Sequence, residues 1–226
     1  MAEMKERNLV RRYLVFTCGV ILNASGVAVI TSADLGTTPV SSLAYVLSML
    51  FPLSFGTLTL FMNVLMVFLQ AMLLRREFQF IQYLQVVTAL VFGVIIDAVM
   101  MILRMVPIDN YMERFGLLLV GSALLAIGIC FEVYCNVMYI PGEGLVKALS
   151  LRMKKEFGVI KVCLDVALVC LALTVSFFFL SRVIGLREGT LFCALTVGLL
   201  ARFFIKKLRV IERWVHAAPQ EHDSLP

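Results

Sequence analysis

The stretch PVSSLAYVLSMLFPLSFG, from Pro39 to Gly56, returns as PGEGLVKALSLRMKKEFG, from Pro141 to Gly158. A shift of 102 positions aligns the opening proline, two leucines, a serine and the closing Phe-Gly pair of the two stretches. Glycine and proline mark positions where a backbone bends or approaches another segment closely, so this shared register predicts a structural repeat. The register extends outward through further glycine pairs: Gly19 with Gly121, Gly26 with Gly128 and, after three extra residues in one loop, Gly93 with Gly198.

The composition is that of a membrane protein. Hydrophobic residues make up 61% of the 226 residues and charged residues only 15%, whereas soluble domains carry about 25% charged residues. The first apolar segment follows a charged start without a small-residue cleavage site, so we expect a retained span and not a signal peptide. The pattern predicts six spans: Tyr13–Ser32, Phe55–Leu74, Phe80–Leu103, Phe115–Val137, Val159–Ser181 and Thr190–Phe204.

Two shorter apolar segments, Pro39–Phe51 and Pro141–Met153, are too short to cross a bilayer. Each starts at a proline, which suits the first turn of a helix. Either they enter the membrane and line a cavity, or they lie flat at its two surfaces, as the basic stretch Leu151–Glu156 favours for the second one. We favour the first interpretation.

The basic residues predict the orientation. Lys and Arg gather at the N-terminus, after the second span, between residues 147 and 155, and in the tail, whereas residues 33–54 and 105–113 contain none. By the positive-inside rule both termini are cytoplasmic, and equivalent loops of the two halves lie on opposite faces.

We therefore expect one all-α membrane domain of six transmembrane helices, arranged as two inverted three-helix repeats, each with an extra short proline-started helix. Repeat 1 spans about residues 9–104, repeat 2 about residues 111–210, and a polar tail covers 211–226. The alternative is a simple duplication in which both short segments also span, but it loses the charge asymmetry between equivalent loops.

Four motifs are informative together: LGTTP (Leu35–Pro39), SFGTLTLFMN (Ser54–Asn63), FGVIIDAVM (Phe92–Met100) and REGTLFCALTVG (Arg187–Gly198). They resemble motifs of the YitT/YczE-type family of bacterial integral membrane proteins, in its short form without the soluble C-terminal domain. The resemblance implies a location in the bacterial cytoplasmic (inner) membrane and a transport function, because that family is classified beside drug exporters.

Three acidic residues within the spans are candidates for proton coupling, because ionisable groups in a membrane are costly and usually functional. Glu132 is the preferred proton carrier, since a buried carboxyl can load and release a proton near neutral pH. Asp97 is either a second coupling site or a capped acid near a helix end. Asp165 either serves the site or is neutralised by Lys161, one turn earlier.

The proline segments supply the candidate substrate site, because a helix that ends within the membrane presents free N–H groups and a positive dipole end. Hydroxyls surround the first helix start, and glycines with one carboxyl surround the second. Asparagines within or beside the spans add further polar groups. The candidate binding residues are Asn23, Thr37, Thr38, Pro39, Ser41, Ser42, Asn63, Asn136, Pro141, Gly142, Glu143 and Gly144.

No Walker A or G-x-S-x-G pattern occurs, and the two histidines, His216 and His222, lie in the tail. We therefore expect neither an enzyme nor a cofactor or metal, and the net charge of +5 reflects cytoplasmic anchoring and not nucleic-acid binding. The expected function is secondary transport of a small organic molecule, as proton-coupled export by alternating access. The alternative is a non-transporting accessory or lipid-binding protein. The expected partners are membrane lipids and the substrate, with a homodimer left open.

Overall fold

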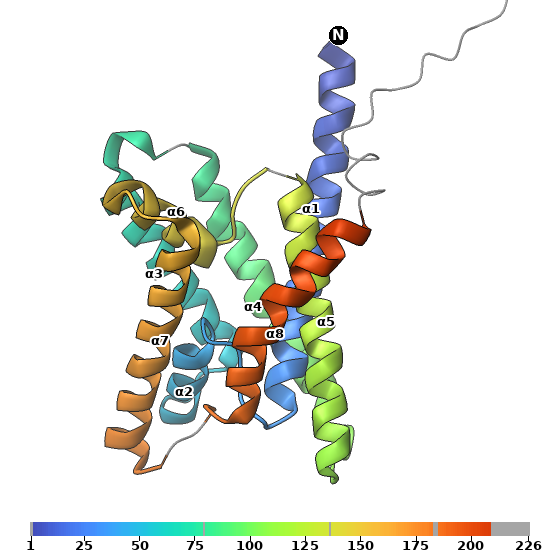
Figure 1. Ribbon diagram of the computed structural model, residues 1–226, viewed down its shortest axis with the longest axis vertical. Coiled ribbons are helices and arrows are strands. Elements are labelled where there is room, and N and C mark those ends of the chain that lie inside the picture. The colour runs from blue at the N-terminus through green and yellow to red at the C-terminus, as the bar shows by residue number, and fades with distance from the viewer. Residues whose placement is uncertain (1, 79, 136, 183–184, 209–226) are drawn as a thin grey trace, which may run out of the picture.

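The computed structural model describes residues 2–78, 80–135, 137–182 and 185–208, and this part of the chain is α-helical (Figure 1). Six helices, namely α1, α3, α4, α5, α7 and α8, are long and apolar enough to cross a membrane, which confirms the predicted spans. The helices are α1 (Ala2–Ser32), α2 (Ser42–Leu50), α3 (Phe55–Leu74), α4 (Leu84–Leu103), α5 (Tyr111–Cys135), α6 (Pro141–Met153), α7 (Phe157–Leu180) and α8 (Glu188–Lys207). Two 3₁₀ turns, Arg75–Glu77 and Phe80–Tyr83, join α3 to α4.

The two halves are inverted relative to each other. In Figure 1 α1 runs down from the N-terminus, whereas its equivalent α5 runs up from the other end of the bundle. The short helices α2 and α6 accordingly lie at opposite ends, with α6 at the end where α1 begins, called here the N-terminal end. The predicted all-α fold of two inverted three-helix repeats is confirmed.

Close backbone packing joins the halves at the crossing of α1 and α5. A Cβ atom on Gly26 would lie 2.8 Å from the carbonyl oxygen of Gly121, and one on Gly128 would lie 2.8 Å from that of Gly19. The four glycines are those that the sequence repeat aligns, so the crossing is itself nearly symmetric. Small residues of this kind let membrane helices approach closely and gain van der Waals contact.

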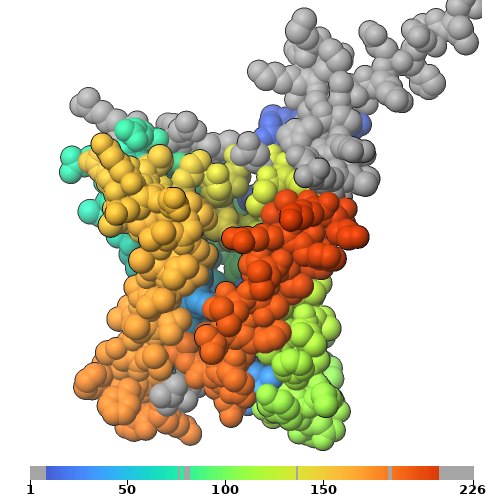
Figure 2. Space-filling model, in the orientation of Figure 1, coloured from blue at the N-terminus to red at the C-terminus, as the bar shows by residue number. Residues whose placement is uncertain are grey.

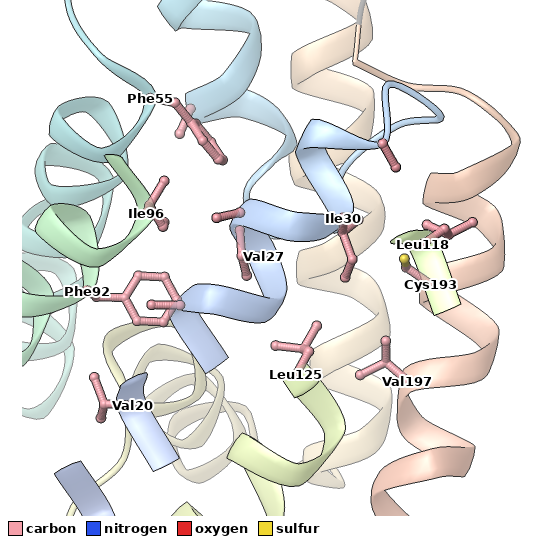
Figure 3. Packing of buried hydrophobic residues seen from close by; sticks show 14 of the residues in the cluster. Val20, Val27, Ile30, Phe55, Phe92, Ile96, Leu118, Leu125, Cys193 and Val197 are labelled. Carbon is pink, nitrogen blue, oxygen red and sulfur yellow. The ribbon is translucent and has the colours of Figure 1, made fainter. Parts of the chain in front are cut away.

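The main hydrophobic core lies around this crossing, between α1, α4, α5 and α8 (Figure 3). Its buried side chains are at most 9% exposed. A second cluster ties α2 and α6 to α3 and α7. The main core includes Val20, Val27, Ile30, Phe92, Ile96, Leu118, Leu125, Cys193 and Val197.

The short helices interlock the halves, because α2 packs against α7 of the other half and α6 packs against α3. Helix α6 begins at Pro141, as predicted. Helix α2 begins at Ser42, three residues later than the predicted start at Pro39. The segment after Pro39 forms a turn instead, in which the N–H and hydroxyl of Ser42 both bind the Pro39 carbonyl.

The halves differ in how their last two spans pack. In the first half α3 and α4 touch at Gly56 and Gly93, where a Cβ on Gly93 would lie 2.6 Å from the Gly56 oxygen. The equivalent glycines of the second half, Gly158 and Gly198, have nothing within 4 Å of a built Cβ. Helices α7 and α8 are thus spread apart, and Figure 2 shows a hollow between them.

Candidate functional site

A cavity of about 450 Å³ opens at the N-terminal end, between the last turns of α3 and α5, the first turn of α4, and α6. Exposed side chains of Glu77, Lys147 and Leu151 form its rim, and the buried Glu132 and Gln85 lie at its inner end. We call it the carboxylate cavity, because the carboxyls of Glu132 and Glu143 both line it.

Glu132 is held from α1 and is only 5% exposed. The side-chain amide of Asn23 donates a hydrogen bond to its Oε1 at 3.0 Å. The other oxygen, Oε2, is buried without a hydrogen-bond partner in the described part of the chain. The structure thus brings two predicted site residues together, with one carboxylate oxygen left for a proton or a ligand. Asn136, another candidate binding residue, lies outside the described residues.

The start of α6 forms the adjoining wall, where Pro141, Gly142 and Gly144 are buried and Glu143 is partly exposed. Burial raises the pKa of the Glu143 carboxyl; Lys161 opposes this shift and Asp165 adds to it. Glu143 therefore keeps a proton to higher pH than an exposed glutamate does.

Two buried glutamines, which the sequence reasoning missed, connect α3, α4 and α6 beside the cavity. The amide nitrogen of Gln70 donates to the side-chain oxygen of Gln85 at 3.1 Å and to the carbonyl of Pro141 at 2.9 Å. The available signal was their polarity within apolar helices, which usually marks an inward-facing position. The Gln70 amide therefore fixes the start of α6, and Glu143 with it.

Gly144 packs directly on this glutamine, and a matched pair of variants tests that contact. A Cβ on Gly144 would lie 2.5 Å from the Gln70 Oε1, whereas one on Gly142 would meet its nearest atom at 3.5 Å. We expect Gly144→Ala to lower the free energy of unfolding by about 2 kcal/mol, because the buried amide must leave its hydrogen bonds. Gly142→Ala should leave it unchanged. Thermal unfolding of the purified variants measures both, and equal midpoints would contradict the expectation.

A second cavity, of about 510 Å³, opens at the opposite end of the bundle, between α1, α2, α3 and α4. It is the repeat-equivalent of part of the first, since Thr31, Tyr45 and Met49 line it where Val133, Lys147 and Leu151 line the carboxylate cavity. The buried core of Figure 3 lies between α1, α4, α5 and α8 in the middle of the bundle. One difference is chemical, because the apolar Ile30 occupies the position equivalent to Glu132.

The predicted hydroxyls of Thr37, Thr38, Ser41 and Ser42 form hydrogen bonds within the protein and do not line either described cavity. Thr37 bonds Thr31 at 2.7 Å between hydroxyl oxygens, and Thr38 donates to Ser41 at 3.0 Å. The Thr37 N–H binds the hydroxyl of Thr190 on α8. The starts of the two proline segments do meet, because a Cβ on Gly142 would lie 3.5 Å from Cγ1 of Val40 and both segments share one apolar cluster, while α2 and α6 extend from there toward opposite ends of the bundle.

The remaining candidates do not line the carboxylate cavity. Asp97 accepts hydrogen bonds from the Gly56 N–H at 2.8 Å and the Ser54 hydroxyl at 2.5 Å, so it caps the start of α3 at the opposite end. Asp165 is paired with Lys161 at 3.1 Å, and Asn63 is half-buried on α3.

Together these features define a multi-pass α-helical membrane protein with an inverted repeat and a cavity that holds a buried carboxyl. The chain belongs to a family of unknown function, DUF6198, whose model matches residues 10–206 and so covers both repeats. No curated protein and no solved structure matches the chain.

Proposed function

We propose that the protein is a secondary transporter that exports a small organic molecule by alternating access, coupled to proton entry. The observation that carries this proposal is the pair of cavities at opposite ends of the bundle, whose walls share three repeat-equivalent positions. Inverted repeats with a site between them are typical of transporters in which each half alternates between two conformations. The resemblance to the YitT/YczE-type family agrees with this function.

The unequal packing of the halves supports two states. Helices α3 and α4 are closed at Gly56 and Gly93, and α7 and α8 are open at Gly158 and Gly198. Exchanging the two conformations would close α7 on α8 and open α3 from α4, which moves access from one end of the bundle to the other. Gly158 and Gly198 supply the glycine positions at which α7 and α8 would pack closely in the second conformation.

Glu132 is the proposed proton carrier, since it is buried, lines a cavity and keeps one oxygen without a partner in the described chain. The distribution of Lys and Arg predicts that the N-terminal end is cytoplasmic. The carboxylate cavity then faces the cytoplasm, where an exported substrate enters.

Filling the open glycine of α8 tests alternating access. We expect Gly198→Leu to fold and to trap the present state, because the leucine finds space now but prevents α8 from closing on α7. Spin labels at the exposed Val159 and Leu199 report the separation of α7 and α8. The parent protein should show two distance populations whose ratio changes on acidification, and Gly198→Leu should keep only the longer one.

The matched control is Gly116→Leu, because Gly116 also has nothing within 4 Å but does not take part in the repeated glycine contact. Both populations should persist in this control. A single, pH-independent population in the parent protein would contradict alternating access and favour the non-transporting, lipid-binding alternative, with the hollow between α7 and α8 as its site.

A further inference from the structure

We propose that the carboxylate cavity binds a small organic cation whose ammonium or guanidinium N–H groups donate hydrogen bonds to Glu132. This inference rests on the proposed transport function and adds the chemical class of the substrate. Its starting point is the unpaired oxygen of Glu132. Asn23 supplies a donor to Oε1 only, and Oε2 is buried without one in the described chain.

A buried acceptor without a donor costs free energy, more so when the group is charged. The second buried atom without a partner in the described chain is also an acceptor, the Gln70 Oε1, which lies against Gly144 on the cavity wall. Its orientation follows from the carbonyl of Pro141, which can only accept and therefore faces the amide nitrogen of Gln70. What this region lacks is a donor, so a hydrogen-bond-donating ligand fits it.

The charges that line the cavity also favour a cationic ligand. Glu77, Glu132 and Glu143 oppose one base, Lys147, whose ammonium lies over the Tyr139 ring at 4.3 Å from its centre. Two bases on neighbouring helices have partners of their own: Lys161, which also acts on Glu143, is paired with Asp165, and Arg12 donates to the carbonyl of Cys135 at 2.7 Å. A low-dielectric cleft with excess negative charge attracts and retains cations.

Apart from Gln82 and Gln85, most of the remaining wall is apolar and accommodates the body of an amphipathic molecule. Val133, Val137, Met138 and Leu151 contribute to it. The volume of about 450 Å³ lies within the range usual for small-molecule sites. The described cavity at the other end is lined by one carboxylate, Asp34, which is already paired with Arg114 and Arg187, so we assign the cation site to the N-terminal end.

A cation and a proton then compete for the same oxygen. Because the cation binds the ionised carboxylate, its affinity for the protein falls when the pH falls and Glu132 and Glu143 take up protons. The other charges around these two carboxyls are Glu77, Lys147 and the Lys161–Asp165 pair. Release of the cation by an entering proton is the exchange that proton-driven export requires.

Binding to the purified full-length protein tests the inference without a transport assay. The probes are N–H cations, namely phenethylammonium, benzamidinium, agmatine and spermidine, with three isosteres of the first: phenethyl alcohol, phenylacetate and phenethyltrimethylammonium. We expect at least one N–H cation to bind, measured by calorimetry, and the alcohol and the carboxylate not to bind. The trimethyl compound keeps the charge but lacks the donor, and should bind about tenfold more weakly.

Two variants should change cation affinity in opposite directions. Glu132→Gln should weaken it by about tenfold or more, and Lys147→Gln should strengthen it by about threefold, because one removes the attracting charge and the other the repelling one. If Glu132→Gln does not fold, Glu143→Gln replaces it. Binding by none of the four N–H cations, equal binding of the alcohol, or unchanged affinity in these variants would overturn the inference.

Different results would contradict the transport function and the cationic substrate class. Cation binding without any flux in proteoliposomes would leave the site in place and refute the transport function. Flux of neutral or anionic molecules through a protein that binds none of the cations would refute the substrate class and leave transport standing.

Discussion

Glu132→Gln is expected to reduce flux driven by a pH gradient to the level of protein-free liposomes. Glutamine keeps an oxygen that can accept the Asn23 hydrogen bond, so the fold is retained, but its amide cannot take up or release a proton at physiological pH. The measurement uses phenethylammonium uptake into proteoliposomes with an imposed pH gradient, with an internal pH dye to follow the protons.

Asp97→Asn is the matched control, since it removes a span carboxyl that caps α3 at the other end of the bundle. It should lower stability by about 1 kcal/mol through the weakened cap and leave gradient-driven flux intact. Loss of flux in Asp97→Asn with normal flux in Glu132→Gln would transfer the coupling role to Asp97. Normal flux in both would exclude proton coupling through either residue.

A single methyl group at the α1–α5 crossing should have the largest effect on stability. We expect Gly128→Ala to destabilise the protein by about 3 kcal/mol, because its Cβ would lie 2.6 Å from the backbone nitrogen of Asn23, and neither backbone can yield without separating the helices. The separation would also displace Asn23 from Glu132.

A glycine-to-alanine change at another position of α5 should raise the stability of the protein instead of lowering it. Gly116 has nothing within 4 Å, so Gly116→Ala should stabilise the helix by up to about 1 kcal/mol through its higher helix propensity. Thermal unfolding midpoints of the two variants should therefore lie on opposite sides of the parent value. A Gly128→Ala midpoint at or above that of the parent would show that the crossing is looser than described.

The sequence predicted the features that depend on local composition and on the repeat. Apolar runs defined the spans, and the predicted Phe55–Leu74 is the observed α3. The glycine register marked the positions of close backbone approach, but the structure was needed to show that they meet at the α1–α5 crossing. The asymmetry of basic loops anticipated the inversion, because charges near a span restrict which face it can occupy.

Features that depend on tertiary contact were harder to predict. The start of α2 shifted because the Pro39 carbonyl accepts bonds from Ser42 and forms a turn. The hydroxyl of Thr37 looked available but meets Thr31 on α1. The Gln70–Gln85 pair joins two helices whose facing sides no sequence pattern specifies. The separation of α7 from α8 belongs to one conformation of the protein. The sequence contains Gly158 and Gly198 but does not specify in which conformation they come into contact.

The interlocking of the short helices has a consequence for biosynthesis. During translation the first half is complete before α5 and α6 are synthesised. The glycine face of α1 and the Gln70 side of α3 therefore remain unpacked in the membrane until their partner helices are inserted. Insertion of the first four helices therefore cannot produce the packed core, which forms only after the second half has been inserted in the opposite orientation. The membrane-insertion machinery or the surrounding lipid must cover these surfaces in the interval, and the orientation of the second half decides whether the polypeptide matures.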